Sequence, residues 1–363
     1  MKLAMFMMPI HPPARDYHAT LREDLEAIIH ADQLGFDAFW LGEHFTAAAE
    51  PITSPLLFFA QAIPQTQRIK FCTGVINLPQ LHPAVVAGYA AMFDHMCEGR
   101  FVMGVSAGGL PSDFELFGLQ DDAARPQMML ESLQMILHLW THDPPYDLKG
   151  KYWQIKMDEW VWPEVGLGSM RRPFQKPHPP IALSAMSPFS KTVSLAAARR
   201  WHAVTANFIP HNHVASHWQM YRKGAQEAGI EPDPDRWSVA RHILVAETDA
   251  EAKAYLSRRD HALVHYYQYL IGLMKRANFA AIMKPDGDMP DDQLTVPWAL
   301  ENLIIAGSPH TVAEKILAFR QQVGPFGTIV MVAHDWDDPA FHKRSMELMA
   351  HEVMPMLNKA TAT

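Results

Sequence analysis

The feature that most constrains the fold of this chain is a regular alternation of short apolar runs and amphipathic helical patterns. Runs that predict buried strands lie at residues 3–8, 37–41, 69–74, 100–106, 180–184, 202–206, 237–245 and 328–332. Helical patterns between them include residues 17–34, 54–63, 83–96, 127–140, 213–228 and 311–323. Eight strands that each lead into a helix predict a closed parallel (β/α)8 barrel, the TIM barrel of the α/β class, which typically needs about 250 residues.

The length of the chain, 363 residues, exceeds that minimum, and the surplus falls into insertions at about residues 141–179 and 248–301. We therefore expect one domain over residues 1–363 that contains these two insertions. The competing architecture, an open doubly wound sheet, normally has a glycine-rich turn after its first strand. Here that turn, residues 8–13, contains no glycine. The barrel is favoured, and its functional groups should gather at the carboxyl ends of the strands.

Composition excludes several classes of partner. The net charge of −8, without a dense basic stripe, argues against nucleic acid. No run of about 20 apolar residues predicts a membrane span, and the N-terminal segment is too short and proline-rich for a signal peptide. The cysteines Cys72 and Cys97 stand singly, which suits a reducing compartment, and we expect a cytoplasmic protein. The 20 histidines show no metal-ligand spacing, so no metal is expected.

A Glu43-His44 pair follows the second predicted strand. Because the unperturbed pKa of histidine lies near neutral pH, His44 is a candidate acid or base. The alternative is a histidine that is simply hydrogen-bonded to a neighbouring loop.

Small residues follow the third and fourth strands, around Gly74 and Ser106, and leave room for a flat ligand, although close packing of the barrel rim explains glycines equally well. The fifth strand runs into residues 184–192, where hydroxyls and backbone N–H groups at a helix N-terminus could hold a phosphate. Ser-Pro openings, such as Ser308-Pro309, are also ordinary helix caps.

Aromatic and apolar side chains crowd both insertions, which makes them too apolar for free linkers. Residues 265–269 read His-Tyr-Tyr-Gln-Tyr, and residues 152–162 contain three tryptophans. Each insertion should cover either the mouth of the barrel or another subunit.

Several short motifs, in order along nearly the whole chain, resemble the bacterial luciferase-like flavin monooxygenases, and within them the diketocamphane and limonene monooxygenase group. They are Leu-Gly-Glu-His-Phe at 41–45, Thr-Gly-Val-Ile-Asn-Leu-Pro at 73–79, Glu-Gly-Arg-Phe at 98–101, Gly-Gly-Leu-Pro-Ser-Asp at 108–113, Gly-Lys-Tyr-Trp at 150–153, Gly-Ser-Pro-His-Thr-Val at 307–312 and Ala-His-Asp at 333–335.

The resemblance implies roles for particular residues. It places His44, with Glu43, beside the flavin ring as the catalytic pair, and a non-prolyl cis peptide at Gly74-Val75 under that ring. Ser106 stands where luciferase has a reactive cysteine, and Ala107 replaces the arginine that follows it, so Lys191 is a candidate substitute cation. The cofactor-binding residues that the resemblance implies are Gly74, Val75, Ser106, Ala185, Met186, Ser187 and Ser190, the last four in the phosphate loop.

The resemblance also implies an activity. Reduced FMN, used as a cosubstrate, would react with dioxygen to a flavin hydroperoxide that inserts one oxygen atom into a small apolar substrate such as a cyclic ketone, terpene or aldehyde. A separate NAD(P)H-flavin reductase would supply the reduced FMN, and family members are usually homodimers. Two alternatives stay open: a deazaflavin-dependent hydride-transfer enzyme of the same fold, and a flavin-binding protein without turnover.

Overall fold

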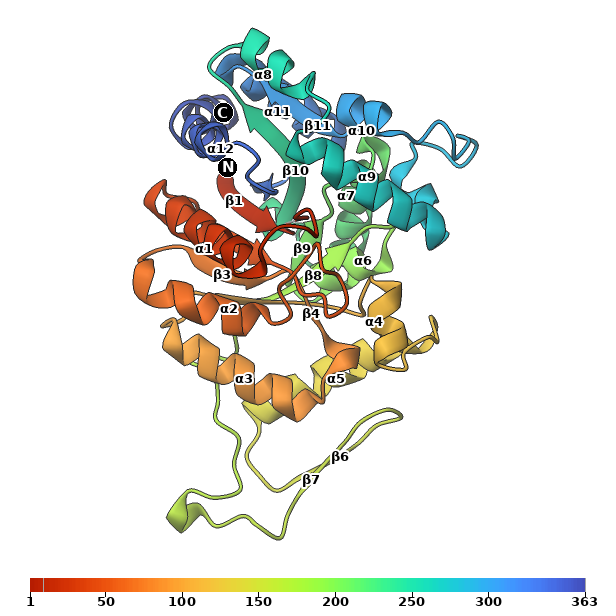
Figure 1. Cartoon of the computed structure of the whole chain (residues 1–363). Coiled ribbons are helices and arrows are strands. Elements are labelled where there is room, and N and C mark those ends of the chain that lie inside the picture. The colour runs from red at the N-terminus through yellow and green to blue at the C-terminus, as the bar shows by residue number, and fades with distance from the viewer. Residues whose placement is uncertain (9, 363) are drawn as a thin grey trace.

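The protein, described from a computed structural model over residues 1–8 and 10–362, contains a closed barrel of eight parallel strands (Figure 1). These strands are β1 (Lys2–Met7), β2 (Ala38–Leu41), β3 (Lys70–Thr73), β5 (Phe101–Ser106), β8 (Ile181–Ala185), β9 (His202–Thr205), β10 (Trp237–Val245) and β12 (Thr328–Ala333). Each pairs in parallel with the next, and β12 pairs with β1 to close the sheet. The predicted (β/α)8 barrel is confirmed, with all eight strands where the apolar runs place them.

Alternation of side chains along the strands separates two apolar layers. On β1, Leu3, Met5 and Met7 belong to the large core between the sheet and the helices, whereas Ala4 belongs to a second cluster inside the barrel. Small residues are frequent in that inner cluster, which also contains Ala38, Ala182 and Ala240. Because small side chains do not fill the interior, they leave space below the carboxyl ends of the strands.

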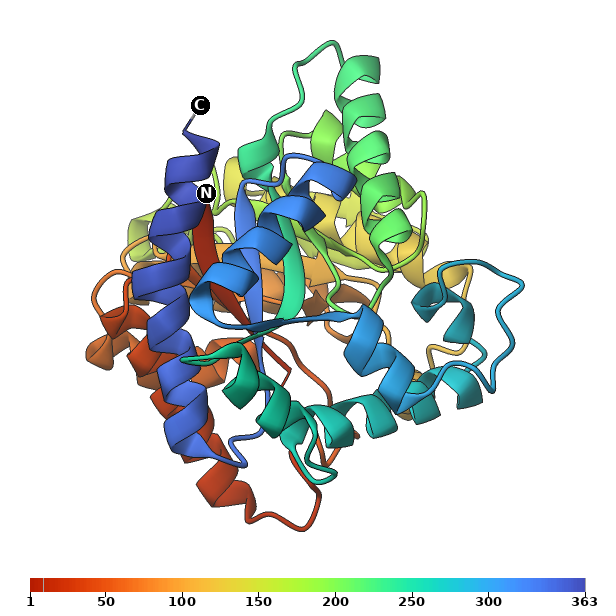
Figure 2. The ribbon, with the colours of Figure 1, turned by 90° about the horizontal axis from the view of Figure 1, so that it is seen from above.

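Helices surround the sheet on its outer face (Figures 1 and 2). The main ones are α1 (Tyr17–Gln33), α2 (Pro55–Ala62), α3 (Pro83–Met96), α5 (Ala124–Thr141), α6 (Lys191–Ala198), α7 (His211–Glu227), α11 (Pro309–Val323), α12 (Pro339–Leu348) and α13 (Met354–Thr361). A short helix, α4 (Pro111–Leu116), follows β5. Ser308 is the N-cap of α11, with its hydroxyl accepting from the N–H of Thr311, so the Ser-Pro opening there is an ordinary cap. None of the described helices combines the length and apolar character needed to cross a bilayer.

Four short strands were not predicted. β4 (Ile76–Asn77) pairs with the end of β5, and β11 (Ile304–Gly307) pairs with the second half of β10, residues 242–245. β6 (Tyr146–Lys149) and β7 (Gln154–Met157) form an antiparallel hairpin in the first insertion.

The first insertion projects away from the barrel as an arm beyond α3 and α5 (Figure 1). The Glu131 carboxylate on α5 anchors the hairpin by accepting from the backbone N–H groups of Lys151, Tyr152 and Trp153. No residue of this insertion lines the cavity described below, and Trp160 and Trp162 are exposed. Of the two predicted roles, covering the barrel mouth is therefore excluded for residues 141–179.

The second insertion folds over the carboxyl ends of the strands. It contains α8 (Asp249–Leu256), α9 (Ala262–Arg276) and α10 (Val296–Asn302), and Figure 2 shows α9 running past the barrel in teal. Leu270, Leu273 and Met274 of α9 line the cavity. This insertion is the one that covers the mouth.

Candidate active site

A deep cavity opens at the carboxyl ends of the barrel strands, with about 1090 Å³ of empty space including its opening to solvent. Its floor includes Phe6, Trp40 and Ala182 from the barrel interior, and its outer wall is the apolar side of α9. Most residues of this lining are apolar or glycine, and among the described residues that form it none is lysine or arginine. A large apolar cavity with a few polar groups is the usual form of a small-molecule site.

His44 lies in the loop that follows β2. It lines the cavity, and its ring lies between two carboxylates. Its Nε2 is 2.9 Å from Oε2 of Glu50, an ion-pair contact without hydrogen-bond geometry, and its Nδ1 is 3.3 Å from Oδ2 of Asp113. Burial lowers the pKa of the imidazole, but the two carboxylates outweigh that effect and raise the pKa of His44 to about 10. His44 is thus an imidazolium at neutral pH. It lines the cavity, where a catalytic acid or base is expected, and it is also paired with neighbouring segments, as the alternative interpretation expects.

Asp113, on α4, is held so that it stays ionised. Its carboxylate accepts from the backbone N–H groups of Phe45 and Thr46 and from the hydroxyl of Thr46. Burial alone would raise the pKa of Asp113, but the hydrogen bonds from His44 and Thr46 outweigh it and lower that pKa. Neither Asp113 nor Glu50 was among the predicted site residues, although the motif at 108–113 marks the position of Asp113.

Glu43 lines the same cavity and is buried. Its Oε1 accepts from the N–H of Asn77 on β4 at 2.7 Å. Burial raises the pKa of Glu43 to about 7, against the effects of that hydrogen bond and of His44. The Glu43-His44 pair therefore contains one carboxyl that titrates near neutrality and one imidazole that stays charged.

Gly74, Val75 and Ser106, the residues expected to hold a flavin ring, also line the cavity. The peptide bond between Gly74 and Val75 is cis, as the resemblance implies. Packing requires the glycine at position 104, because a Cβ there would lie 1.9 Å from the carbonyl oxygen of Thr73. The alternative reading of the glycines, close packing of the rim, is thus correct at Gly104.

The loop between β8 and α6 lies at the rim of the cavity. Met186 lines the cavity, whereas Ala185, Ser187 and Ser190 do not. Lys191, the candidate substitute cation, is exposed and borders a shallow groove between α6 and α7 instead. The lining thus contains no lysine or arginine in place of the arginine that Ala107 replaces.

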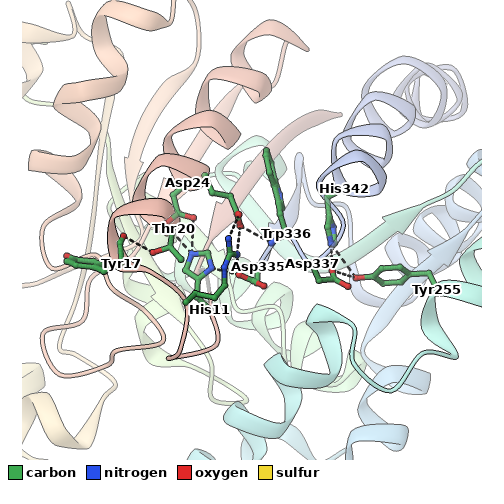
Figure 3. Close-up of polar contacts among 11 residues, drawn as sticks. His11, Tyr17, Thr20, Asp24, Tyr255, Asp335, Trp336, Asp337 and His342 are labelled. Carbon is green, nitrogen blue, oxygen red and sulfur yellow. Dashed lines mark hydrogen bonds and ion pairs between the residues drawn. The ribbon is translucent and has the colours of Figure 1, made fainter.

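A second cluster of charged residues lies outside the cavity (Figure 3). It connects the segments that follow β1 and β12, the two strands whose pairing closes the barrel. Nδ1 of His11 is 2.6 Å from Oδ1 of Asp335, and its Nε2 is 3.2 Å from Asp24. Arg15 forms ion pairs with Glu23 and Asp335. His11, Glu23 and Asp335 bring their ligand atoms within 4.8 Å of one another, but both carboxylates already form ion pairs with the guanidinium of Arg15. We interpret the cluster as a structural charge network.

Comparison with known proteins agrees with this geometry. The family model of luciferase-like monooxygenases matches residues 1–325. The chain is 29% identical to 3,6-diketocamphane 1,6-monooxygenase of Pseudomonas putida, over 98% of each chain. It is 29% identical to limonene 1,2-monooxygenase of Rhodococcus erythropolis, over 97% of this chain and 86% of the other.

A solved structure is similar over the same extent. It is the oxygenating constituent of 3,6-diketocamphane monooxygenase from Pseudomonas putida, described as a type II Baeyer–Villiger monooxygenase in complex with FMN. The TM-score is 0.87 with 30% sequence identity, over 98% of both chains. The chain belongs to the luciferase-like monooxygenase family. The predicted resemblance to the diketocamphane and limonene monooxygenases, and the predicted enzyme class, are confirmed.

Proposed function

We propose that this protein is a reduced-FMN-dependent monooxygenase that inserts one oxygen atom from dioxygen into a small apolar substrate, a cyclic ketone, a terpene or an aldehyde. The observation that carries the proposal is the position of the His44 imidazolium, between Glu50 and Asp113, at the polar end of an otherwise apolar cavity. The relatives named above act on camphane ketones and limonene, which supports an apolar substrate of similar size.

The residues at the cavity fit FMN. Phe6, Trp40 and Val75 supply apolar surface for a flat ring, and Gly109 leaves its side of the cavity open, since a Cβ there would meet no atom nearer than 4.0 Å. Gly74, Val75 and Ser106 would hold the ring. The β8–α6 loop, Ala185 to Ser190 with Met186 and Ser187, would hold the phosphate at the N-terminus of α6.

When bound, reduced FMN supplies the electrons that activate dioxygen and the site from which one oxygen atom is delivered. The role of His44 is to hold a proton on each ring nitrogen, and its positive charge stabilises negative charge that develops beside it. Glu43, whose pKa is near 7, can accept or release a proton at working pH. The apolar side chains of α9 that line the cavity would exclude water from the reacting atoms.

A separate NAD(P)H-flavin reductase belongs to this proposal. The chain contains no glycine-rich dinucleotide fingerprint in its first βα turn. A relative that is 24% identical over 93% of this chain is named as the oxygenase component of a flavin-dependent trigonelline monooxygenase. The free and buried cysteines Cys72 and Cys97 support a reducing, cytoplasmic location.

A homodimer through α2 and α3 is also part of the proposal. The inner faces of these helices pack on the barrel through Phe59 and Phe93, whereas Leu57, Tyr89 and Met92 are 74%, 58% and 60% exposed. Such an exposed apolar face marks an interaction surface. Light scattering during gel filtration should give the mass of a dimer, and Met92→Glu should shift the protein to a monomer; a monomeric wild type would contradict the proposal.

The activity is tested by anaerobic titration with reduced FMN, followed by isotopically labelled dioxygen and a panel of cyclic ketones, terpenes and aldehydes. We expect products that contain one labelled oxygen atom. His44→Gln should lower their rate of formation roughly a hundredfold or more, while His18→Gln, an exposed position on α1, should not.

Other outcomes decide for the alternatives. Absence of oxygenated product from folded, flavin-loaded protein would exclude the proposed activity and leave a flavin-binding protein without turnover. Tighter binding of a deazaflavin than of FMN, with hydride transfer in the absence of oxygen, would establish the deazaflavin enzyme instead.

A further inference from the structure

The β8–α6 loop is fixed from behind by two consecutive side chains of α7. Nε2 of His217 lies 2.8 Å from the carbonyl oxygen of Ser187, and the backbone N–H of Phe189 donates to Oγ of Ser216 at 2.9 Å. Both α7 residues are buried. Hydrogen bonds thus hold the backbone on both sides of Pro188 to a single helix, α7.

The other ring nitrogen of His217 reaches the barrel. Its Nδ1 lies 2.9 Å from Oγ1 of Thr205, the last residue of β9, which lines the cavity. The indole Nε1 of Trp237, at the start of β10, donates to the same Thr205 oxygen at 2.9 Å. His217 therefore connects the wall of the cavity to the loop at its rim.

The chemistry of the partners fixes the direction of every hydrogen bond in this chain. A carbonyl oxygen can only accept, so the proton of His217 is on Nε2. Burial lowers the pKa of His217 to about 4, so the imidazole is neutral and its Nδ1 accepts from the hydroxyl of Thr205. Trp237 donates to Thr205, Thr205 to His217, and His217 to Ser187. Each group has its partner, which leaves a single tautomer and a single ring orientation.

We infer that His217 is a positioning residue for the phosphate of the flavin: it holds the Ser187 backbone, and through it the β8–α6 loop, in the shape that receives that group. The inference rests on the proposed function, which places the phosphate at this loop. His217 does not line the cavity, so it does not contact the cofactor itself, and its hydrogen bond to Ser187 is the one that reaches the phosphate loop.

Comparison of FMN with riboflavin isolates this role, because the two ligands differ only in the phosphate. Both are titrated in reduced form, under anaerobic conditions, by calorimetry into the full-length wild type and variants. His217→Phe, which keeps a ring but loses both hydrogen bonds, should weaken FMN binding about tenfold and leave riboflavin binding unchanged within about twofold. Gln219→Ala, at an exposed position on the same helix, should change neither.

Two polar variants test the hydrogen bonds of the two ring nitrogens separately. The side-chain amide of His217→Gln can reach the position of Nε2 and should restore FMN binding to within about threefold of wild type. His217→Asn reaches only the Thr205 side and should bind FMN as weakly as His217→Phe. If His217→Phe does not fold, Ser216→Ala removes the second tie and should show the same selective loss.

The outcomes distinguish the inference from the proposed function. A wild type that binds FMN no more tightly than riboflavin would remove the phosphate site and the inference together. A wild-type preference for FMN that persists in His217→Phe and Ser216→Ala would overturn the inference alone. An equal loss of both ligands in these variants would show a general packing role, which also overturns it.

Discussion

The Nε2 atom of His44 lies 2.9 Å from a carboxylate oxygen of Glu50, although the N–H does not point along a hydrogen bond. Glu50 comes from the loop after β2 and is buried. The contact is electrostatic, and within a buried site such a charge is screened far less than in water. Glu50 and Asp113 together, rather than either alone, keep His44 protonated against the cost of its burial.

Glu50→Gln should lower the pKa of His44 from about 10 because it removes the largest favourable contribution to the charged imidazole. The alkaline limb of kcat/KM for oxygenation should then move to lower pH by about one unit or more. The measurement is the pH profile of product formation between about pH 6 and pH 10. Glu26→Gln, an exposed carboxylate on α1, is the control, and an identical profile in Glu50→Gln would show that the charge of His44 does not limit the reaction.

His11 makes the stability of the protein depend on pH. Burial lowers its pKa, but hydrogen bonds to Asp24 and Asp335 outweigh burial and raise the pKa from 6.5 to about 9. Because the folded state binds this proton more tightly than the unfolded state, the stabilisation is complete below pH 6.5 and is lost as the pH rises through about 9.

His11→Gln should therefore flatten the loss of stability between these pH values, a difference on the order of 1–3 kcal/mol. Urea unfolding at a series of pH values measures it. His18→Gln should keep the wild-type slope, and a slope that persists in His11→Gln would assign the effect to another group.

Arg241, on β10, is a buried guanidinium whose hydrogen bonds go to backbone carbonyls. The acceptors are Ala206, Asn207, Ile209 and Ala240. Burial lowers the pKa of Arg241 to about 10. Arg241→Met should destabilise the protein by about 3 kcal/mol or more, since it removes the donor of all these hydrogen bonds at a buried position. Arg222→Met, at an exposed position on α7, should be neutral in the same unfolding measurement.

Leu273 of α9 should set the size of substrate that the cavity admits. Leu273→Trp fills space at the apolar wall and should lower kcat/KM for the bulkiest accepted substrate roughly tenfold or more. Binding of reduced FMN should stay unchanged, because the cofactor is held from the strand ends. Gln268→Trp, on the outer face of the same helix, is the matched control; equal losses in the two variants would show a general effect on α9.

The barrel could be predicted from the sequence because most of its strands are short runs of mainly buried residues, as at β10, where all residues are buried. The positions of Glu43, His44, Gly74 and Ser106 at the cavity could be predicted for a topological reason, whereas Val75 and Met186 are implied by the family resemblance. Carboxyl ends of parallel strands meet at one face of the barrel, whatever the helices between them do.

What could not be predicted depends on contacts between distant segments. Asp113 is 69 residues from His44, and the Ser187 carbonyl is 30 residues from His217, so no local pattern marks either pair. The strands β4 and β11 are too short for a periodic signal. Aromatic content predicts that each insertion covers the barrel mouth or another subunit, but composition does not say which. The fold places residues of 248–301 at the mouth and directs residues 141–179 away from it.

The pairing of β10 with β11 brings the two ends of the second insertion together, because residues 242–245 lie beside residues 304–307. Neighbouring strands are about 4.8 Å apart, so the chain leaves the barrel and returns to it at almost one point. A loop closed in this way can change in length and composition at little entropic cost to the rest of the molecule. The segment that contains α9 can therefore vary independently of the barrel strands that it connects. Evolution or a protein engineer can exchange it to change what enters, while the flavin end of the barrel stays as it is.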